Sequence, residues 1–338
     1  MKILARFFFI LTLLAASSAQ VLAQQPDEVL TVNTSLVRLN VGVVDAQGRP
    51  AINLTEQNFT VYENNIKQKI ARFEPTVTPF SLVLLLDVSG STKPIRQMMA
   101  QTAARFIDAL PPETRISVVA FNEKNDVLTD FTTNRKNVYY AVSLVESQKK
   151  GGETMLYKAL DFSFDRLRGE GKRRKAIVVL TDGIDTDFEA DDRRIVSAAN
   201  ATTAETAVAA VKPEQNSKLA AVLDDADKQG ITVYPLALPT GDPARIADPL
   251  PFQVAKYTAA RARLQILANR TGGTMNAINR LEDMGRLYAS VAAELGALYS
   301  VEYQPSNEPK RDGKWHTIRI EVNSPDLIAK TRPGYYAK

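Results

Sequence analysis

The apolar positions of the chain follow two different periods, and the period changes twice. Between residues 37 and 43, apolar side chains alternate with polar residues or glycine, as in a half-buried strand. Near residue 81 this alternation gives way to continuous apolar runs separated by amphipathic stretches, and after residue 299 the alternation returns. The pattern therefore predicts strands at both ends of the chain and a different architecture between them.

The central region has apolar runs that predict strands covered on both faces, at residues 82–86, 115–121, 176–181 and 231–236. A short edge strand is expected at 127–131. Helices are predicted between and after these strands by apolar residues three and four positions apart, such as Ile95, Met99, Ala103, Phe106 and Leu110 in one case and Leu281 to Leu298 in another. This alternation predicts an α/β fold, with a doubly wound, mostly parallel sheet and helices on both sides.

The two strand-rich ends are each too small to bury a core well. Asn64-Asn65 and Asp312-Gly313 are hairpin turn signals within them. We expect the N-terminal β segment (24–76) to pair with the C-terminal β segment (299–338) in one small β module, with the α/β domain at 77–298 between them. Two separate, poorly ordered flaps are the alternative.

Residues 185–229 fit this pattern least. Asp185, Asp187, Glu189, Asp191 and Asp192 form an acidic cluster, and Ala-rich stretches follow it. A solvated acidic loop is the favoured interpretation, because runs of like charge are usually solvated; a second cation site is the alternative.

Composition excludes several kinds of chemistry. The chain has no cysteine, which removes disulfides, thiolate metal sites and thiol nucleophiles. Its single histidine, His316, lies in a strand-like stretch, and no G-x-S-x-G motif accompanies it, so a serine hydrolase is not expected. The formal net charge is +4, and Lys2 and Arg6 lie in a segment that we expect to be removed, which leaves about +2. Nucleic-acid binding is therefore not expected.

The N-terminus predicts export. Lys2 and Arg6 precede an apolar run from Phe7 to Ala16, and Val21-Leu22-Ala23 fits a signal-peptidase site. We interpret residues 1–23 as a signal peptide, with an uncleaved anchor as the alternative. No later apolar run is long enough for a membrane helix. The mature protein is expected in the periplasm or outside the cell, with no integral membrane segment.

Three polar segments stand at or near predicted strand ends. Asp87-Val88-Ser89-Gly90-Ser91 follows the first buried strand, Thr154 opens a helix, and Thr181-Asp182-Gly183 ends a later strand. Ligands of open parallel sheets bind at the carboxyl ends of the strands. We expect Gly90 to let the chain turn so that the first segment faces one point. The candidate metal ligands are Asp87, Ser89, Ser91, Thr154 and Asp182.

All five candidates supply oxygen, and only two are charged, which selects a hard divalent cation. Mg²⁺ is the preferred ion, with Mn²⁺ or Ca²⁺ as substitutes, and it would keep a position open for one external oxygen, such as a carboxylate from a protein partner. No general base stands nearby in sequence, so recognition is favoured over catalysis. The alternatives are that these side chains only satisfy turn amides, or that the site is vestigial.

Asp87-x-Ser89-x-Ser91, Thr154 and Asp182-Gly183 resemble the metal-ion-dependent adhesion site of the von Willebrand factor type A (VWFA) domain family. The wider chain resembles bacterial exported VWFA-related proteins, in which strand segments flank the domain. The resemblance implies a Rossmann-like fold, direct metal binding by the two serines, and binding by Thr154 and the aspartates directly or through water. It also implies a last helix, Leu281 to Leu298, that can shift when ligand binds. Residues 185–229 depart from compact members.

These features predict an exported, non-enzymatic binding protein that engages an acidic side chain of a protein partner through the metal. The first alternative is an envelope structural or assembly protein whose metal is mainly structural. A metal-dependent phosphoryl-transfer enzyme is a minor alternative, because such sites favour a second carboxylate in a D-x-D pattern and this chain has Ser89 there.

Overall fold

The computed structural model describes residues 36–47, 49–76, 79–148, 151–171, 173–306 and 312–337. The expected signal peptide (1–23) and the first part of the expected N-terminal β segment lie outside these residues. All described residues belong to one compact unit. Within the described ranges, no helix combines the length and the apolar composition needed to cross a membrane.

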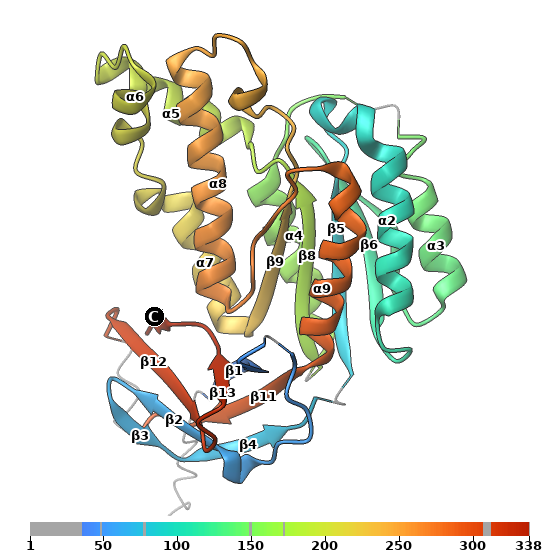
Figure 1. Ribbon diagram of the computed structural model, residues 1–338, viewed down its shortest axis with the longest axis vertical. Coiled ribbons are helices and arrows are strands. Elements are labelled where there is room, and N and C mark those ends of the chain that lie inside the picture. The colour runs from blue at the N-terminus through green and yellow to red at the C-terminus, as the bar shows by residue number, and fades with distance from the viewer. Residues whose placement is uncertain are drawn as a thin grey trace, which may run out of the picture. The chain divides into compact units, whose positions relative to one another are not determined.

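A six-stranded sheet in the order β10-β9-β8-β5-β6-β7 forms the centre of the α/β domain (Figure 1). All of its neighbouring strands pair in parallel except the edge strand β7, which is antiparallel to β6. The predicted mostly parallel sheet with an edge strand is therefore confirmed. The strands are β5 (Phe80–Asp87), β6 (Arg115–Phe121), β7 (Asn125–Thr132), β8 (Arg174–Thr181), β9 (Ile231–Ala237) and β10 (Asn276–Ala277).

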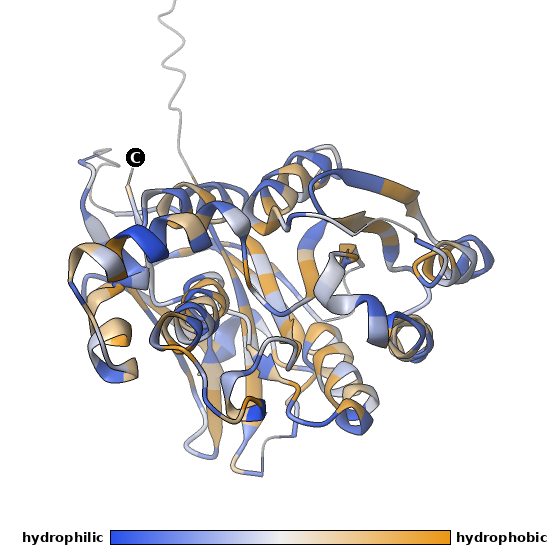
Figure 2. Cartoon of the chain, turned by 90° about the horizontal axis from the view of Figure 1, so that it is seen from above, coloured by the Kyte–Doolittle hydropathy of each residue, from blue (hydrophilic) through white to orange (hydrophobic). Residues whose placement is uncertain are grey.

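Helices cover both faces of this sheet because alternate residues of each strand point to opposite sides. Leu82, Leu84 and Leu86 of β5 pack in one core with α2, α3 and α9, whereas Val83 and Leu85 pack in the other with α4, α7 and α8. The helices are α2 (Arg96–Ala109), α3 (Arg135–Ser143), α4 (Leu156–Arg168), α7 (Ser217–Gln229), α8 (Pro251–Thr271) and α9 (Met284–Gly296). Seen from above, the central strands are mostly coloured as hydrophobic, and the surrounding helices carry both colours (Figure 2). This doubly wound arrangement confirms the predicted fold class.

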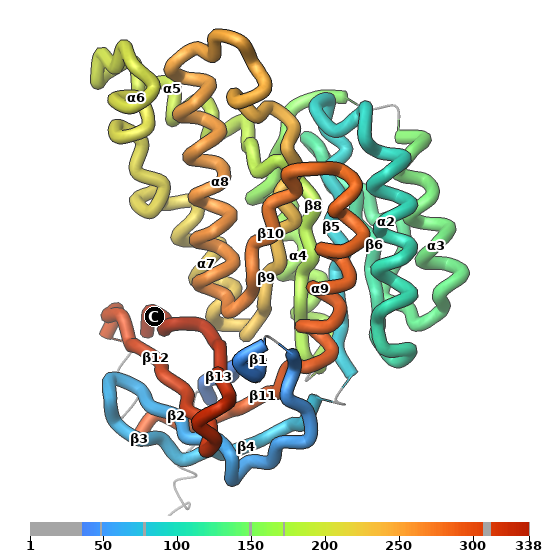
Figure 3. The backbone as a smooth tube through the Cα atoms, viewed as in Figure 1, coloured from blue at the N-terminus to red at the C-terminus, as the bar shows by residue number. Residues whose placement is uncertain are grey.

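Strands from both ends of the chain form two further sheets, in the orders β13-β1-β11-β4 and β14-β12-β2-β3. Segments near the two ends of the colour scale lie side by side there (Figure 3), and β1 pairs antiparallel with β11 from Val37↔Tyr303 to Gly42↔Leu298. The sheets share one hydrophobic core, so they constitute one β module. Its strands are β1 (Val37–Asp45), β2 (Phe59–Glu63), β3 (Ile66–Gln68), β4 (Ile70–Glu74), β11 (Leu298–Tyr303), β12 (Trp315–Val322), β13 (Leu327–Lys330) and β14 (Gly334–Tyr336).

The β module contacts the C-terminal ends of α7 and α8. Asp227 of α7 accepts from Arg270 of α8 at 2.6 Å and from Arg332 at 3.2 Å. The Arg270 guanidinium also lies 3.8 Å from the ring centre of Trp315 in β12. Asn40 of β1 donates to the Gly230 carbonyl at 3.1 Å. These contacts fix the module to the α/β domain at the end of the sheet opposite the carboxyl ends of its parallel strands.

The acidic stretch after residue 185 is a helix, so the expected solvated loop is wrong. Helix α5 (Thr186–Ala198) begins at Asp185, whose side chain accepts from the Asp187 and Phe188 amides. Glu189 pairs with Arg193 at 3.1 Å, and Asp192 pairs with Arg263. In the described part of the chain, no three His, Cys, Asp or Glu side chains are arranged to hold a metal. Helix α6 (Ala204–Ala210) follows.

Candidate metal centre

Asp87 is the last residue of β5 and is fully buried. Its Oδ1 accepts from the Ser89 amide at 2.9 Å, and its Oδ2 accepts from the Thr181 hydroxyl at 2.7 Å. The first bond shapes the turn that leaves β5, and the second reaches the end of the neighbouring strand β8. Asp87 therefore holds two of the three predicted segments together.

Asp182 uses its two oxygens in the same way. Its Oδ1 accepts from the Ile184 amide at 3.0 Å, and its Oδ2 accepts from the Ser91 hydroxyl at 2.8 Å. Both aspartates thus make the local turn bond that their residue type favours. The turn-amide interpretation explains one oxygen of each carboxylate, and it leaves the other oxygen to act between segments.

Ser89, Ser91 and Asp182 present a continuous row of oxygens. Ser89 Oγ and Ser91 Oγ are 3.1 Å apart, and Ser91 Oγ is 2.8 Å from Asp182 Oδ2. Neighbouring ligands of an octahedral Mg²⁺, at bond lengths of about 2.0–2.1 Å, lie about 2.9 Å from one another. The spacing of these oxygens therefore fits adjacent positions around such an ion. Ser91 is exposed, whereas Ser89 and Asp182 are buried, so the row opens to solvent at Ser91.

Thr154 lies in the segment that precedes α4, and two contacts place that segment beside the other two. A Cβ on Gly151 would lie 3.9 Å from the Gly90 Cα. The Thr154 amide donates to Thr186 Oγ at 3.0 Å, and the Thr186 amide donates to the Thr154 carbonyl at 2.8 Å. The bonds that hold Thr154 in place are made through its backbone. The structure thus brings all three segments together at the carboxyl ends of β5 and β8.

The two glycines of these motifs have different roles. Gly183 has φ +82°, and a Cβ there would lie 2.7 Å from Leu264 Cδ1 of α8. Only glycine fits this turn without strain. Gly90 does not have a positive φ, and a Cβ there would meet nothing within 4 Å. The expectation that Gly90 is needed for the turn is therefore wrong; the short helix η2 (Gly90–Ile95) makes the turn instead.

The electrostatics of the site favour a cation. Burial, together with the charge of Asp182, raises the pKa of Asp87 to about 7, although hydrogen bonds from Ser89 and Thr181 oppose the shift. A divalent cation between the carboxylates would offset both unfavourable effects. The buried Arg96 already interacts electrostatically with Asp87, while its guanidinium donates to the main-chain carbonyls of Val88 and Ser89.

Taken together, the donor set fits a hard divalent cation. It offers hydroxyl and carboxylate oxygens from two segments at suitable spacing, and it includes no nitrogen or sulfur ligand. Ser89, Ser91 and Asp182 would hold the ion from one side. The buried Asp87, which accepts from the Ser89 amide, would contribute negative charge next to them. Metal ligation by all five residues, Thr154 included, stays a prediction.

One contact at this site was not expected from the sequence. The Thr240 hydroxyl donates to Asp182 Oδ2 at 3.0 Å. Thr240 lies in Pro239-Thr240-Gly241, shortly after the apolar strand β9, much as Thr181-Asp182-Gly183 stands at the end of β8. Ligands of open parallel sheets bind at the carboxyl ends of the strands, and applying this rule to β9 as well would have identified Thr240.

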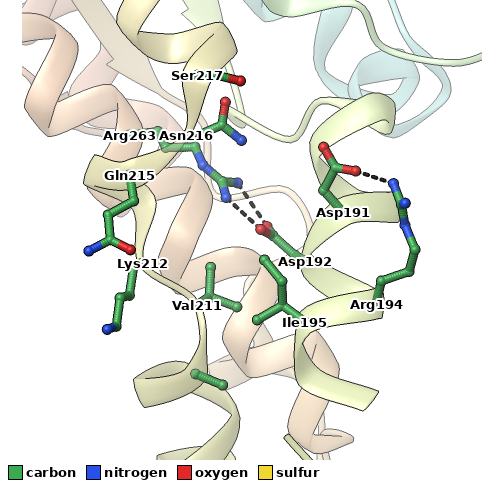
Figure 4. A pocket seen from close by; sticks show the side chains of 11 residues that line it. Asp191, Asp192, Arg194, Ile195, Val211, Lys212, Gln215, Asn216, Ser217 and Arg263 are labelled. Carbon is green, nitrogen blue, oxygen red and sulfur yellow. Dashed lines mark hydrogen bonds and ion pairs between the residues drawn. The ribbon is translucent and has the colours of Figure 1, made fainter. Parts of the chain in front are cut away.

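A separate cavity of about 520 Å³ lies between α5 and the segment that joins α6 to α7 (Figure 4). Its charged groups are largely engaged with one another: Arg263 pairs with Asp192, and Arg194 pairs with Asp191. Asn216 uses its side chain to cap α7. The cavity therefore presents few free polar groups, and it is a weaker candidate than the row of oxygens at the sheet end.

Residues 82–184 match the von Willebrand factor type A domain family, and this segment includes all five candidate ligands. The resemblance seen in the sequence is thereby confirmed for this segment. No curated protein sequence matches the chain.

Several solved structures are similar to the chain. One is a von Willebrand factor type A protein from Catenulispora acidiphila (14% identity, 91% of this chain and 73% of that chain, TM-score 0.46). Another is the vWF domain of the type V pili tip protein Mfa5 from Porphyromonas gingivalis (13% identity, 64% and 94%, TM-score 0.44). A third is proximal thread matrix protein 1 from mussel byssus, with a zinc-occupied adhesion-site motif; this chain spans 48% of it (13% identity, 68% of this chain, TM-score 0.43).

Proposed function

We propose that this protein is an exported binding protein that engages a protein partner through a divalent cation. The cation, Mg²⁺ in the first instance, would be held by Asp87, Ser89, Ser91, Thr154 and Asp182. The observation that carries the proposal is the row of oxygens from Ser89 through Ser91 to Asp182 Oδ2, which has octahedral spacing and opens to solvent at its middle member, Ser91.

The charge balance of the site favours an acidic ligand. Two carboxylates contribute, and each shares its charge with protein donors: Asp87 with Thr181 and the Ser89 amide, and Asp182 with Ser91 and the Ile184 amide. A cation held this way supplies residual positive charge beside the exposed Ser91. A carboxylate from a partner is the natural oxygen to meet it, because it is charged and hard.

A non-enzymatic role is part of the proposal. Proton transfer by histidine, the residue that most often performs it, would need the ring beside the reacting atoms. His316, the only histidine of the chain, lies in β12, where it interacts with Glu63 and Asp312 of the β module. Ser89 stands where a phosphoryl-transfer site would favour a second carboxylate. Both features favour binding over catalysis.

A purely structural metal is the second candidate. The three segments are already joined by protein bonds that involve no ion: Thr181 to Asp87, Ser91 to Asp182, and the paired backbone of Thr154 and Thr186. Because hydrogen bonds within the protein already connect these segments, a metal is less necessary for holding them together. This supports recognition rather than assembly of the fold as the use of the cation.

The test is calorimetric titration of the chain lacking residues 1–23 with Mg²⁺, Mn²⁺, Ca²⁺ and Zn²⁺. Zn²⁺ is included because zinc occupies the corresponding motif of the mussel protein. Ser89→Ala is expected to abolish binding, and Ser197→Ala, at an exposed serine of α5, serves as the matched control. Absence of binding by the unaltered protein would overturn the proposal.

Recognition is tested by selecting displayed random peptides on the immobilised protein with Mg²⁺ and with EDTA. Peptides that bind only with Mg²⁺ are expected to share an Asp or Glu whose replacement by Asn or Gln abolishes binding. Metal-dependent peptides without an essential acid would contradict the proposed mode. Export is tested separately: amino-terminal sequencing of the protein recovered from a bacterial periplasm should begin near Gln24, whereas a retained leader would contradict cleavage.

A further inference from the structure

Asp182 Oδ2 accepts two hydroxyl donors that come from different loops. Ser91 Oγ donates from the segment after β5 at 2.8 Å, and Thr240 Oγ donates from the loop after β9 at 3.0 Å. Oδ1 of the same carboxylate accepts from the Ile184 amide. The orientation of this buried carboxylate is therefore set by three donors, of which Thr240 lies far in sequence from the three segments identified from the sequence.

The backbone around Thr240 is fixed by the sheet. The Leu238 amide donates to the Thr181 carbonyl at 2.8 Å, so the chain leaves β9 in register with the end of β8. Gly241 has φ +73°, and a Cβ there would lie 3.4 Å from Ile184 Cδ1, so the loop runs along the turn that follows Asp182. Thr240 thus reaches Asp182 through main-chain placement and not through a long flexible side chain.

We propose that Thr240 is a positioning residue of the metal site, which holds Asp182 Oδ2 in the orientation that the cation requires. The inference rests on the proposed function. Without the Thr240 hydroxyl, Oδ2 would lose one of its two donors, and the carboxylate could rotate away from Ser91. Hydrogen bonds that orient metal ligands from behind typically change metal affinity by about 10–100-fold when they are removed.

Two substitutions separate the hydroxyl from the rest of the side chain. Thr240→Val keeps the branched shape and removes the donor, whereas Thr240→Ser keeps the donor. Thr203→Val is the matched control, because Thr203 also uses its hydroxyl in a hydrogen bond, as the cap of α6. For each variant of the chain lacking residues 1–23, the dissociation constants of Mg²⁺ and Mn²⁺ are measured by calorimetry, and the melting temperature is measured in EDTA.

Thr240→Val is expected to weaken binding of both ions by about tenfold or more. Thr240→Ser should stay close to the unaltered protein in affinity, and Thr203→Val should lower the melting temperature without changing affinity. Equal affinity of the Val variant and the unaltered protein would overturn this inference alone. Equal losses in the Val and Ser variants would also overturn it, because the hydroxyl would then not be the cause. No metal binding by the unaltered protein would overturn this inference and the proposed function together.

Discussion

The Thr181 hydroxyl donates a 2.7 Å hydrogen bond to Asp87 Oδ2, and this bond joins the carboxyl ends of β8 and β5. It connects a residue of one predicted segment to a residue of another. The buried Asp87 carboxylate, which accepts this bond, has a raised pKa because burial and the charge of Asp182 both disfavour its ionised form. The metal-free site is therefore electrostatically unfavourable, and this has a measurable consequence.

Asp87→Asn should remove the buried charge but keep an acceptor for the Ser89 amide. We expect the metal-free variant to be at least as stable as the unaltered protein, because repulsion with Asp182 is relieved. Mg²⁺ at 100 times the dissociation constant should raise the free energy of unfolding of the unaltered protein by about 2.7 kcal/mol, and that of the variant not at all. Urea unfolding with and without Mg²⁺ measures both quantities. A variant that Mg²⁺ still stabilises would show that Asp87 is not needed for the ion.

Gly183→Ala should destabilise the protein strongly. The new Cβ would occupy a positive-φ conformation and would lie 2.7 Å from Leu264 Cδ1. Backbone strain of about 1–2 kcal/mol adds to an overpacking cost of about 1–3 kcal/mol. Gly90→Ala is the matched control, since a Cβ there meets nothing within 4 Å, and it should change stability by no more than about 0.5 kcal/mol. Similar unfolding curves for the two variants would contradict this account of the two glycines.

Asp192 and Arg263 form a two-bond ion pair between α5 and α8, and both side chains are almost completely buried. Asp192→Ala would leave the guanidinium buried without its charged partner. We expect a loss of about 3–5 kcal/mol in the free energy of unfolding. The double variant Asp192→Leu with Arg263→Met should lose much less, because no buried charge remains. Additive losses in the double variant would show that the side chains contribute mainly through separate packing.

His316 should make the stability of the β module depend on pH. Partial burial lowers its pKa, but hydrogen bonds and charges from Glu63 and Asp312 outweigh burial, so the net shift is upward. His316 Nδ1 lies 2.8 Å from Glu63 Oε1, Nε2 lies 3.3 Å from Asp312 Oδ1, and the ring lies against Tyr335. The protonated ring therefore stabilises the fold fully below about pH 6.5, the unfolded value, and this contribution is lost as pH rises through the folded pKa.

The measurement is the free energy of unfolding between pH 5.5 and 8.5 for the unaltered protein and for His316→Gln. Gln keeps a polar side chain but does not titrate, so the difference between the two proteins isolates the histidine from other titrating groups such as Asp87. The difference should favour the unaltered protein at low pH and should shrink as the pH rises above about 6.5. A difference that is constant over this range would contradict the expectation.

The sequence by itself predicted the strands of the central sheet and the segments that carry the candidate ligands. Continuous apolar runs such as Leu82–Leu86 identify strands that are buried on both faces, because the burial of a strand is visible in its own composition. The candidate ligands were found because parallel strands bring their carboxyl ends to one edge, so that polar residues after β5 and β8 had to lie near each other. Helix α3 was not predicted from the pattern.

The tertiary structure decided what depends on partners distant in the chain. Whether Asp192 lies in a solvated loop or a packed helix depends on Arg263, which lies 71 residues further along the chain in another helix. Local sequence shows where a glycine lies but not what a Cβ at that position would contact. It therefore could not show that the turn at Gly90 has room for a side chain. Thr240 joins the site through a contact between residues 58 positions apart. Such contacts are fixed by strand register and helix packing, and the sequence states neither of them directly.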